Sequence, residues 1–194
     1  DEAQDIVSVR FGSPQGDEVS RDRLKVEVDL DSPRLVAMAL EPRAVTVQVQ
    51  ESSPSMTVWL PTQAPARARS DIARLLGLEP SQVRVVARDV GGAFGARASV
   101  VPEDLLVPWV AKQLGRSVRW LADRSEEFSA GMHGRASRQH GELRFDRSGR
   151  LHGLGAQLQF SLGAWMPFSA VVPLRNAARI LPGPYKVDSI DIEG

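Results

Sequence analysis

Apolar residues alternate with polar ones in several short stretches of the chain, a pattern typical of β-strands with one buried face. The alternating positions of the first stretch are Leu24, Val26, Val28 and Leu30. Those of the second are Val45, Val47 and Val49, and an apolar segment, 56–60, follows the turn-prone segment 52–55. We therefore expect one strand within residues 17–36 and two adjacent strands between residues 36 and 60.

A first helix is predicted by the residues that start and end it. Pro65 suits the first turn of a helix, and Gly77 can adopt the left-handed backbone that ends one. Between them, Ile72, Leu75 and Leu76 fall on one apolar face. The pattern predicts a helix over residues 65–76.

A second helix is expected over residues 102–114. Its first turn is acidic, with Glu103 and Asp104, and it ends at Gly115. Its apolar stripe comprises Leu105, Leu106, Trp109, Val110 and Leu114. Pro108 removes one backbone donor from this helix, so we expect a kink there.

The remaining predicted elements complete a mixed fold. They are strands at 83–87, 118–121, 142–146 and 151–160, the last two forming a hairpin, and a helix at 170–180. Strands and helices in this order suit an α+β (mixed α/β) fold, in which helices pack on a mixed β-sheet. The length of 194 residues allows one domain or two small lobes, and we take one globular unit as the default.

Composition narrows the functional classes. Twenty-four basic side chains balance twenty-four acidic ones, so no summed positive field attracts nucleic acid or anionic lipid. The absence of cysteine excludes disulfides, thiolate zinc sites, Cys-ligated iron–sulfur clusters and a cysteine nucleophile within this chain. No stretch reaches the roughly 20 apolar residues of a membrane-spanning helix. We expect a soluble protein with no nucleic-acid partner and no membrane span.

A glycine-rich loop follows the strand predicted at 83–87. Gly91, Gly92 and Gly95 lack β-carbons, so main-chain N–H groups can approach an anionic ligand closely. Their order does not match the G-x-G-x-x-G dinucleotide fingerprint, and Arg97 is not followed by the serine or threonine of a nucleoside-triphosphate loop. On this pattern alone, a tight strand exit without a ligand stays open.

Three segments carry a resemblance to one enzyme family. They read LEPRA at residues 40–44, WLPTQ at residues 59–63 and DVGGAFGAR at residues 89–97. The family has Met-Glu-Pro-Arg, Ser-Thr-Gln and Gly-Gly-Gly-Phe-Gly-Gly-Lys at these places, and Phe94 follows Gln63 by 31 residues, a spacing similar to that of the family. The chain resembles the N-terminal part of the cofactor-binding region in the molybdopterin-binding large subunit of the xanthine dehydrogenase, aldehyde oxidase and aerobic carbon monoxide dehydrogenase family.

The resemblance implies a function and a site. The parent protein would be a molybdenum-dependent oxidoreductase that hydroxylates an aldehyde, an N-heterocycle or a related carbon centre, with water as the oxygen source. Gln63 would contact the cofactor, molybdopterin or its cytosine dinucleotide form, by donating its amide to an oxygen ligand of molybdenum. The other implied cofactor-binding residues are Gly92, Ala93, Phe94 and Gly95. No residue of the chain would ligate the metal directly, and Phe94 would exclude water from it.

The resemblance also implies partners and a longer parent. Iron–sulfur clusters would be held by a small subunit and FAD by a medium subunit, beside a small-molecule substrate. We expect residues 1–194 to be a fragment of the large subunit, inactive alone, with residues 1–20 as a connecting segment. No catalytic residue is assigned within it, because the glutamate general base and the rest of the cofactor site are expected beyond Gly194. The expected compartment is the cytoplasm, with the periplasm as the alternative.

Some residues depart from the family pattern. Ala93 and Ala96 replace family glycines, and Arg97 replaces the usual lysine. Ala98 stands where purine-oxidising members carry a substrate-binding carboxylate, which disfavours a xanthine-type substrate. The two alanines leave room for a second hypothesis, a noncatalytic scaffold or assembly domain of the same fold without bound cofactor.

Other residues that could carry chemistry receive structural interpretations. His133, His140 and His152 lack the spacing of metal ligands, and the acidic pairs 103–104 and 126–127 are explained by pairing with helix dipoles. Apart from Phe94, we expect the large aromatic residues to lie in the core. These are Trp59, Trp109, Trp120, Trp165, Phe128 and Phe168.

Overall fold

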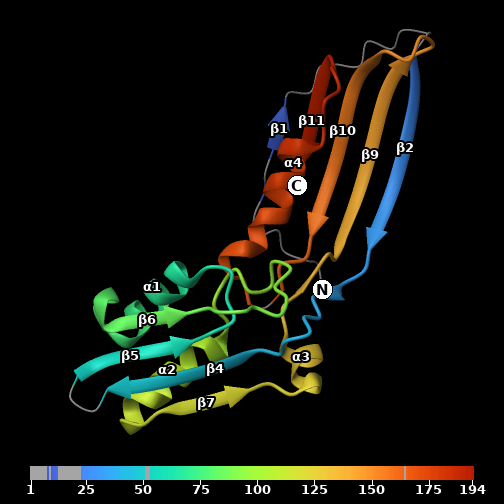
Figure 1. Ribbon diagram of the computed structural model, residues 1–194. Coiled ribbons are helices and arrows are strands. Elements are labelled where there is room, and N and C mark those ends of the chain that lie inside the picture. Colours follow the sequence, from blue (N-terminus) through green and yellow to red (C-terminus); the bar gives the residue numbers. More distant parts are fainter. Residues whose placement is uncertain (1–7, 9, 13–22, 51–52, 164) are drawn as a thin grey trace. The chain divides into compact units, whose positions relative to one another are not determined.

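A computed structural model describes residues 8, 10–12, 23–50, 53–163 and 165–194, and the chain in it divides into two compact units. The central unit comprises Val36–His133, and the terminal unit combines residues 1–35 with residues 134–194. The sequence suggested one unit by default, but each of these two parts has its own sheet (Figure 1).

The central unit contains a four-stranded mixed sheet in the order β6-β5-β4-β7. Its strands are β4 (Ala44–Gln50), β5 (Ser53–Trp59), β6 (Val83–Val86) and β7 (Val118–Leu121). β4 runs antiparallel to β5 and β7, whereas β5 and β6 are parallel. The predicted strands are confirmed, although β5 begins at Ser53, inside the segment expected to be a turn.

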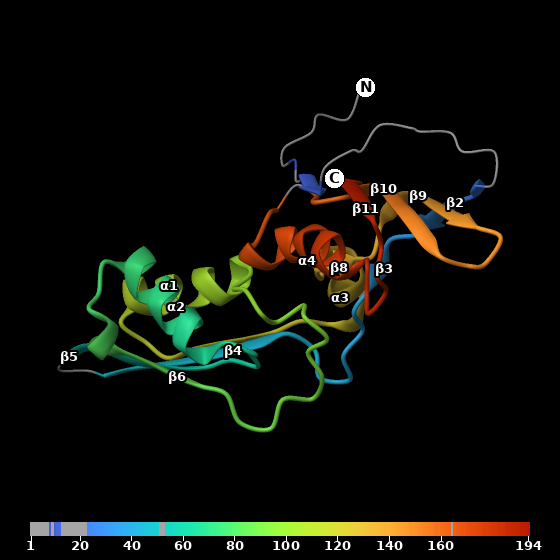
Figure 2. The ribbon, with the colours of Figure 1, turned by 90° about the horizontal axis from the view of Figure 1, so that it is seen from above.

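Helices α1 (Pro65–Leu76) and α2 (Pro102–Leu114) lie on one side of this sheet (Figure 2). Both have the predicted bounds, and both end at a glycine, Gly77 or Gly115, with a φ of +61°. A short 3₁₀ helix, η1 (Pro80–Gln82), and helix α3 (Arg124–Ala130) were not predicted.

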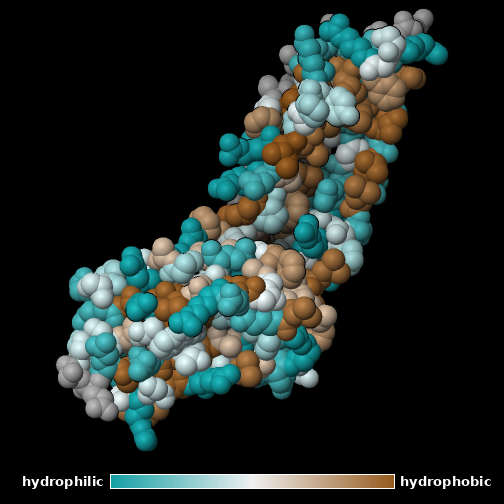
Figure 3. All heavy atoms as spheres, in the orientation of Figure 1, coloured by the Kyte–Doolittle hydropathy of each residue, from teal (hydrophilic) through white to brown (hydrophobic). Residues whose placement is uncertain are grey.

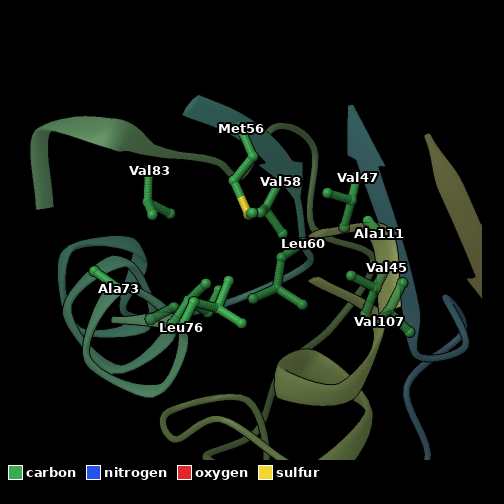
Figure 4. Close-up of a cluster of buried hydrophobic side chains, with 12 residues drawn as sticks. Val45, Val47, Met56, Val58, Leu60, Ala73, Leu76, Val83, Val107 and Ala111 are labelled. Atoms are coloured by element: carbon green, nitrogen blue, oxygen red, sulfur yellow. The ribbon is translucent and has the colours of Figure 1, made fainter. Parts of the chain in front are cut away.

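The hydrophobic core of the central unit lies between the sheet and these two helices. Its buried members are Val45, Val47, Met56, Val58, Leu60, Ala68, Ile72, Ala73, Leu76, Val83, Val107 and Ala111. Figure 4 shows β4 and β5 side chains turned toward those of α1 and α2. The alternating valines of β4 thus place one face of the strand in the core, as their period of two predicts.

The terminal unit contains a five-stranded sheet in the order β1-β11-β10-β9-β2. Its strands are β1 (Arg10–Gly12), β2 (Arg23–Ser32), β9 (Ser137–Asp146), β10 (Leu151–Phe160) and β11 (Ser189–Glu193). All neighbours are antiparallel except β10 and β11, which are parallel. The predicted hairpin is confirmed, with β9 beginning earlier than expected; β11 was not predicted.

The apolar face of the terminal sheet is covered over only part of its width. The 3₁₀ turn η2 (Phe168–Val171) leads into α4 (Val172–Ile180), and the buried cluster here consists of Ala156, Leu158, Leu174, Ala178 and Ile192. The apolar residues of β2 remain exposed, and Figure 3 shows hydrophobic residues at the surface of this sheet. They are Leu24, Val26, Val28 and Leu30.

The expectation that the large aromatic residues lie in the core is wrong for four of the six. The exposed ones are Trp109, Trp165, Phe128 and Phe168. Trp59 and Trp120 are partly buried.

The short strands β3 (Leu35–Val36) and β8 (His133–Gly134) form a separate two-stranded sheet. Within the described residues, no helix is long and apolar enough to span a membrane.

Candidate functional site

The parallel strands β5 and β6 bring two of the three motif segments to the same edge of the central sheet. Gln63 lies between β5 and α1, and the glycine loop, defined here as residues 87–101, lies between β6 and α2. Leu60 N–H donates to the Val86 carbonyl at 3.1 Å, so the two segments stay paired one residue beyond the end of β5. Segments that leave the carboxyl ends of parallel strands are placed to form a joint site.

Gln63 is bonded to the glycine loop through both its main chain and its side chain. Its N–H donates to the Arg97 carbonyl at 3.0 Å, and its Oε1 accepts from Gly95 N–H at 3.0 Å. Thr62 Oγ1 donates to the same Arg97 carbonyl at 3.1 Å. Because Oε1 is engaged, Nε2 is the end of the amide left to donate, and it has no partner among the described residues.

The N–H groups of the loop divide into two sets. Those of Gly91 and Gly95 are used within the chain, by Glu41 Oε2 at 2.7 Å and by Gln63 Oε1. In the part of the chain that the structure describes, the N–H groups of residues 92–94 have no acceptor. Three consecutive main-chain donors and one amide nitrogen are therefore available to an acceptor ligand, which is the composition of an anion-binding nest.

The loop owes its shape to three left-handed residues. Gly92 has a φ of +110° and Gly95 a φ of +87°, and between them Phe94 has a φ of +50°. A bulky residue in this region is strained, and such strain is commonly found at functional sites. Ala93 and Ala96 do not have positive φ, so both places that depart from the family pattern tolerate a β-carbon. The Phe94 side chain is 74% exposed, so within this chain it does not shield the donors from water.

The remaining motif segment, residues 40–44, contacts the same loop through Glu41. Besides the bond from Gly91, Glu41 Oε2 accepts from Arg97 Nη1 at 2.8 Å, and Arg97 Nη2 donates to the Glu41 carbonyl. Arg97 is buried. The sequence presented it only as a departure from the family lysine, and the one available signal was the opposite charges of two motif residues.

A second ion-pair cluster is centred on Arg43 of the same segment, and the sequence analysis did not predict it either. Arg43 donates from Nε to Glu127 Oε1 at 2.9 Å and from Nη1 to both Glu103 carboxylate oxygens at 3.1 Å. Its guanidinium lies 5.6 Å from the centre of the Trp120 ring. Pairing with helix dipoles is thus an incomplete account of these acids, because both side chains hold a buried arginine.

Asp104 adds an ionisable group to the same region. Burial raises the pKa of Asp104 to about 6, against a hydrogen bond from Val101 N–H that lowers it. A cavity of about 20 Å³ is lined by Thr62, Arg97 and Asp104, among others, and is large enough for one water molecule. The site is therefore backed by a polar, largely buried layer.

Each histidine has a partner of its own. In the central unit, His133 Nδ1 lies 2.8 Å from the Gly131 carbonyl oxygen. In the terminal unit, His140 Nδ1 lies 2.8 Å from Asp29 Oδ1, and His152 lies between Asp146 and Asp188 at 3.1 and 3.0 Å. No cluster of three or more metal-binding side chains occurs among the residues with described positions.

Comparison with known proteins supplies the family context. The model of the family described as molybdopterin cofactor-binding domain matches residues 1–194. The chain is 32% identical over 154 residues to the 6-hydroxypseudooxynicotine dehydrogenase complex subunit gamma of Paenarthrobacter nicotinovorans, covering 78% of this chain and 19% of the relative. It is 29% identical over 133 residues to the carbon monoxide dehydrogenase large chain of Hydrogenophaga pseudoflava, covering 69% and 17%.

Among solved structures, quinoline 2-oxidoreductase from Pseudomonas putida 86 is similar with a TM-score of 0.91 and 27% identity, covering 97% of this chain and 24% of that one. The aldehyde oxidoreductase from Desulfovibrio gigas has the same fold at a TM-score of 0.85 and 21% identity, covering 96% and 20%. The chain thus spans less than a quarter of the length of each of these relatives.

Proposed function

The chain belongs to the molybdopterin cofactor-binding domain family, and from that premise we propose that Gln63 and residues 92–95 hold the cofactor in a molybdenum hydroxylase. The observation that carries the proposal is the 3.0 Å hydrogen bond from Gly95 N–H to Gln63 Oε1. It fixes the amide so that Nε2 is left to donate, and it joins Gln63 to the loop whose N–H groups at residues 92–94 have no acceptor among the described residues.

These donors fit the proposed cofactor. Oxo ligands and dithiolene sulfurs are hydrogen-bond acceptors, and among the described residues the site offers them four unpaired donors, the N–H groups of residues 92–94 and Gln63 Nε2. A β-carbon built on Gly95 would meet no other atom within 4 Å, so the main chain is open on that side. Room beside the backbone and a set of donors are what an anionic group with several acceptor atoms requires.

The part played by this chain is orientation. When bound, a molybdenum cofactor supplies the redox step that hydroxylates a carbon centre with water as the oxygen source. Gln63 Nε2 would donate to an oxygen acceptor of the cofactor, and the N–H groups of residues 92–94 would offset its negative charge. The exposed Phe94 ring offers apolar surface that displaces water once a ligand is bound, which strengthens these hydrogen bonds.

We propose an N-heteroaromatic ring as the substrate class. The relatives with 32% and 27% identity are named for 6-hydroxypseudooxynicotine and for quinoline. Ala98 offers no carboxylate of the kind that purine-oxidising members use, so a xanthine-type substrate is disfavoured. Aldehydes are the second class to test, because an aldehyde oxidoreductase shares the fold.

The proposal includes a longer parent with partners. The chain covers 19% of a relative that is itself named as one subunit of a complex. We propose that the parent large subunit adds the rest of the cofactor site and a glutamate general base beyond Gly194, and that small iron–sulfur and medium FAD-binding subunits accept the electrons. The cytosine dinucleotide form of the cofactor and a cytoplasmic location belong to the same proposal.

The test compares Gln63→Ala with wild type in the parent enzyme, expressed with its partner subunits. We expect oxidation of quinoline or nicotine-type heterocycles to fall about 100-fold, since one donor to the reacting centre is lost. Gln113→Ala is the matched control, because Gln113 is an exposed glutamine in the last turn of α2, at the end of the helix opposite to the loop. Unchanged molybdenum content and turnover in Gln63→Ala would reject the assigned role and leave the scaffold hypothesis in its place.

A further inference from the structure

Glu41 bonds to both ends of the central part of the glycine loop. Its Oε2 accepts from Gly91 N–H at 2.7 Å and from Arg97 Nη1 at 2.8 Å. Its main chain adds two bonds, from Glu41 N–H to the Gly91 carbonyl at 3.2 Å and from Arg97 Nη2 to the Glu41 carbonyl. Glu41 therefore connects Gly91 to Arg97, on either side of the candidate binding residues 92–95.

Arg97 connects the hydrogen bonds of Glu41 to Gln63. Its side chain is bonded to Glu41, whereas its carbonyl accepts from Gln63 N–H at 3.0 Å and from Thr62 Oγ1 at 3.1 Å. Any shift of Arg97 would therefore move the main chain of Gln63. The same shift would move Gly95, two residues earlier, which holds the Gln63 amide oxygen.

The close approach of Glu41 depends on a residue without a side chain. A β-carbon added to Gly91 would lie 2.6 Å from the Glu41 β-carbon, closer than two such atoms can be. Inside the loop, Phe94 keeps a φ of +50°, a conformation that persists only where neighbouring contacts hold it. The bonds of Glu41 and Arg97 on either side of residues 92–95 supply such contacts.

The ion pair between Glu41 and Arg97 is restricted by burial and by two contacts. Arg97 is 8% exposed, and its two terminal nitrogens contact a carboxylate oxygen and a carbonyl of the same residue. A guanidinium held at two points has less freedom than a surface ion pair, and removing one partner leaves a buried charge unpaired.

We infer that Glu41 and Arg97 are positioning residues, which lock residues 91–97 so that Gln63 presents Nε2, and not Oε1, to the ligand. The inference rests on the proposed function for the identity of that ligand. The lock itself is a property of this chain and exists without the cofactor. Neither residue touches the ligand; both act through Gly95 and Gln63.

Amide hydrogen exchange of the 194-residue chain without cofactor tests the lock. In Glu41→Gln, which keeps the shape but removes the charge, we expect Gly95 N–H to exchange at least about 10-fold faster, while a core amide such as that of Val47 is unchanged. Arg97→Lys keeps a charge for Glu41 Oε2 but loses the second contact, so a smaller acceleration at Gly95 is expected.

Arg43→Lys is the matched control for these variants. Arg43 is similarly buried and pairs with glutamates of the same unit, but it makes no hydrogen bond to residues 89–97 in the described structure. We expect it to leave the ratio of Gly95 to Val47 exchange unchanged. Equal acceleration of both amides in Glu41→Gln, or none at Gly95 in either Glu41→Gln or Arg97→Lys, would overturn the inference.

A double-mutant cycle in the parent enzyme then separates positioning from general damage. If Glu41 acts through Gln63, Glu41→Gln should slow turnover about 10-fold in wild type and leave Gln63→Ala nearly unchanged. Additive losses would overturn the inference. A wild-type parent without molybdenum would instead reject the proposed function, and the exchange experiment would still decide whether the lock exists.

Discussion

The central and terminal units carry the same alternation of apolar residues but bury it to different extents. In the central unit Val47 is fully buried, because β4 lies under α2. In the terminal unit Val28 of β2 is 48% exposed, because α4 packs over β10, two strands away. Alternation therefore identifies a strand and its apolar face, but it does not tell what covers that face.

The carboxylates of the two units differ in the same way. In the central unit, burial raises the pKa of Asp104 to about 6. In the terminal unit, hydrogen bonds from Ser148 and His152 lower the pKa of Asp146, and bonds from His152 and Arg150 lower that of Asp188. The pH dependences are opposite. Asp104 contributes stability that is lost as pH rises, whereas Asp146 and Asp188 contribute stability that is lost as pH falls.

The largest effect is expected from emptying the central core. Ile72 of α1 is fully buried, and Ile72→Ala should lower the free energy of unfolding by about 4 kcal/mol, since it removes apolar contacts and leaves a cavity. Denaturant titration followed by tryptophan fluorescence measures this, because Trp59, Trp109 and Trp120 all lie in the central unit. A loss below about 1 kcal/mol would mean that this core is loosely packed.

Asp104→Asn should sharpen the contrast in pH dependence. The folded pKa is raised above the ordinary value of 3.8, so the contribution of Asp104 is complete below pH 3.8 and is lost as pH rises through about 6. Between pH 4 and 7, wild type should therefore lose about 2 kcal/mol of stability relative to the variant. Denaturant titrations of both proteins across this range measure the difference, and parallel curves would contradict a buried Asp104.

The smallest effects come from a matched pair of valines. Val47→Thr buries a hydroxyl in the central core and should cost about 2 kcal/mol, whereas Val28→Thr on the terminal sheet should cost less than about 0.5 kcal/mol. Both substitutions keep the β-branched side chain, so strand propensity is held nearly constant. Equal losses, measured by denaturant titration, would show that the β2 face is covered in solution.

Local signals in the sequence were sufficient for most of the fold. The bounds of α1 and α2 were predicted because proline at the start and glycine after the end are constraints of the helix itself. Helix α3 was not predicted, although its N-terminal signal, an aspartate followed three residues later by a glutamate, was present. Asp123 is the N-cap and accepts a hydrogen bond from Glu126 N–H. Its sequence, RSEEFSA, lacks an apolar stripe, which is the pattern on which the other helices were predicted.

The candidate site was predictable only in part. Gln63 and the glycine loop were found through resemblance, and the parallel pairing of β5 and β6 explains why they meet. Glu41 and Arg97 were not found, because they are 56 residues apart and no local periodicity encodes a contact between distant side chains. The burial of Asp104 likewise follows from packing, whereas its position in the first turn of α2 suggested only a dipole contact.

The central claim is that Gln63 and residues 92–95 hold the molybdenum cofactor, and a structure of the molybdenum-loaded parent tests it most directly. The account predicts Gln63 Nε2 about 3 Å from an oxygen acceptor of the cofactor, with Oε1 still bonded to Gly95 N–H. A cofactor bound with no atom within about 4 Å of Gln63 or residues 92–95 would contradict it.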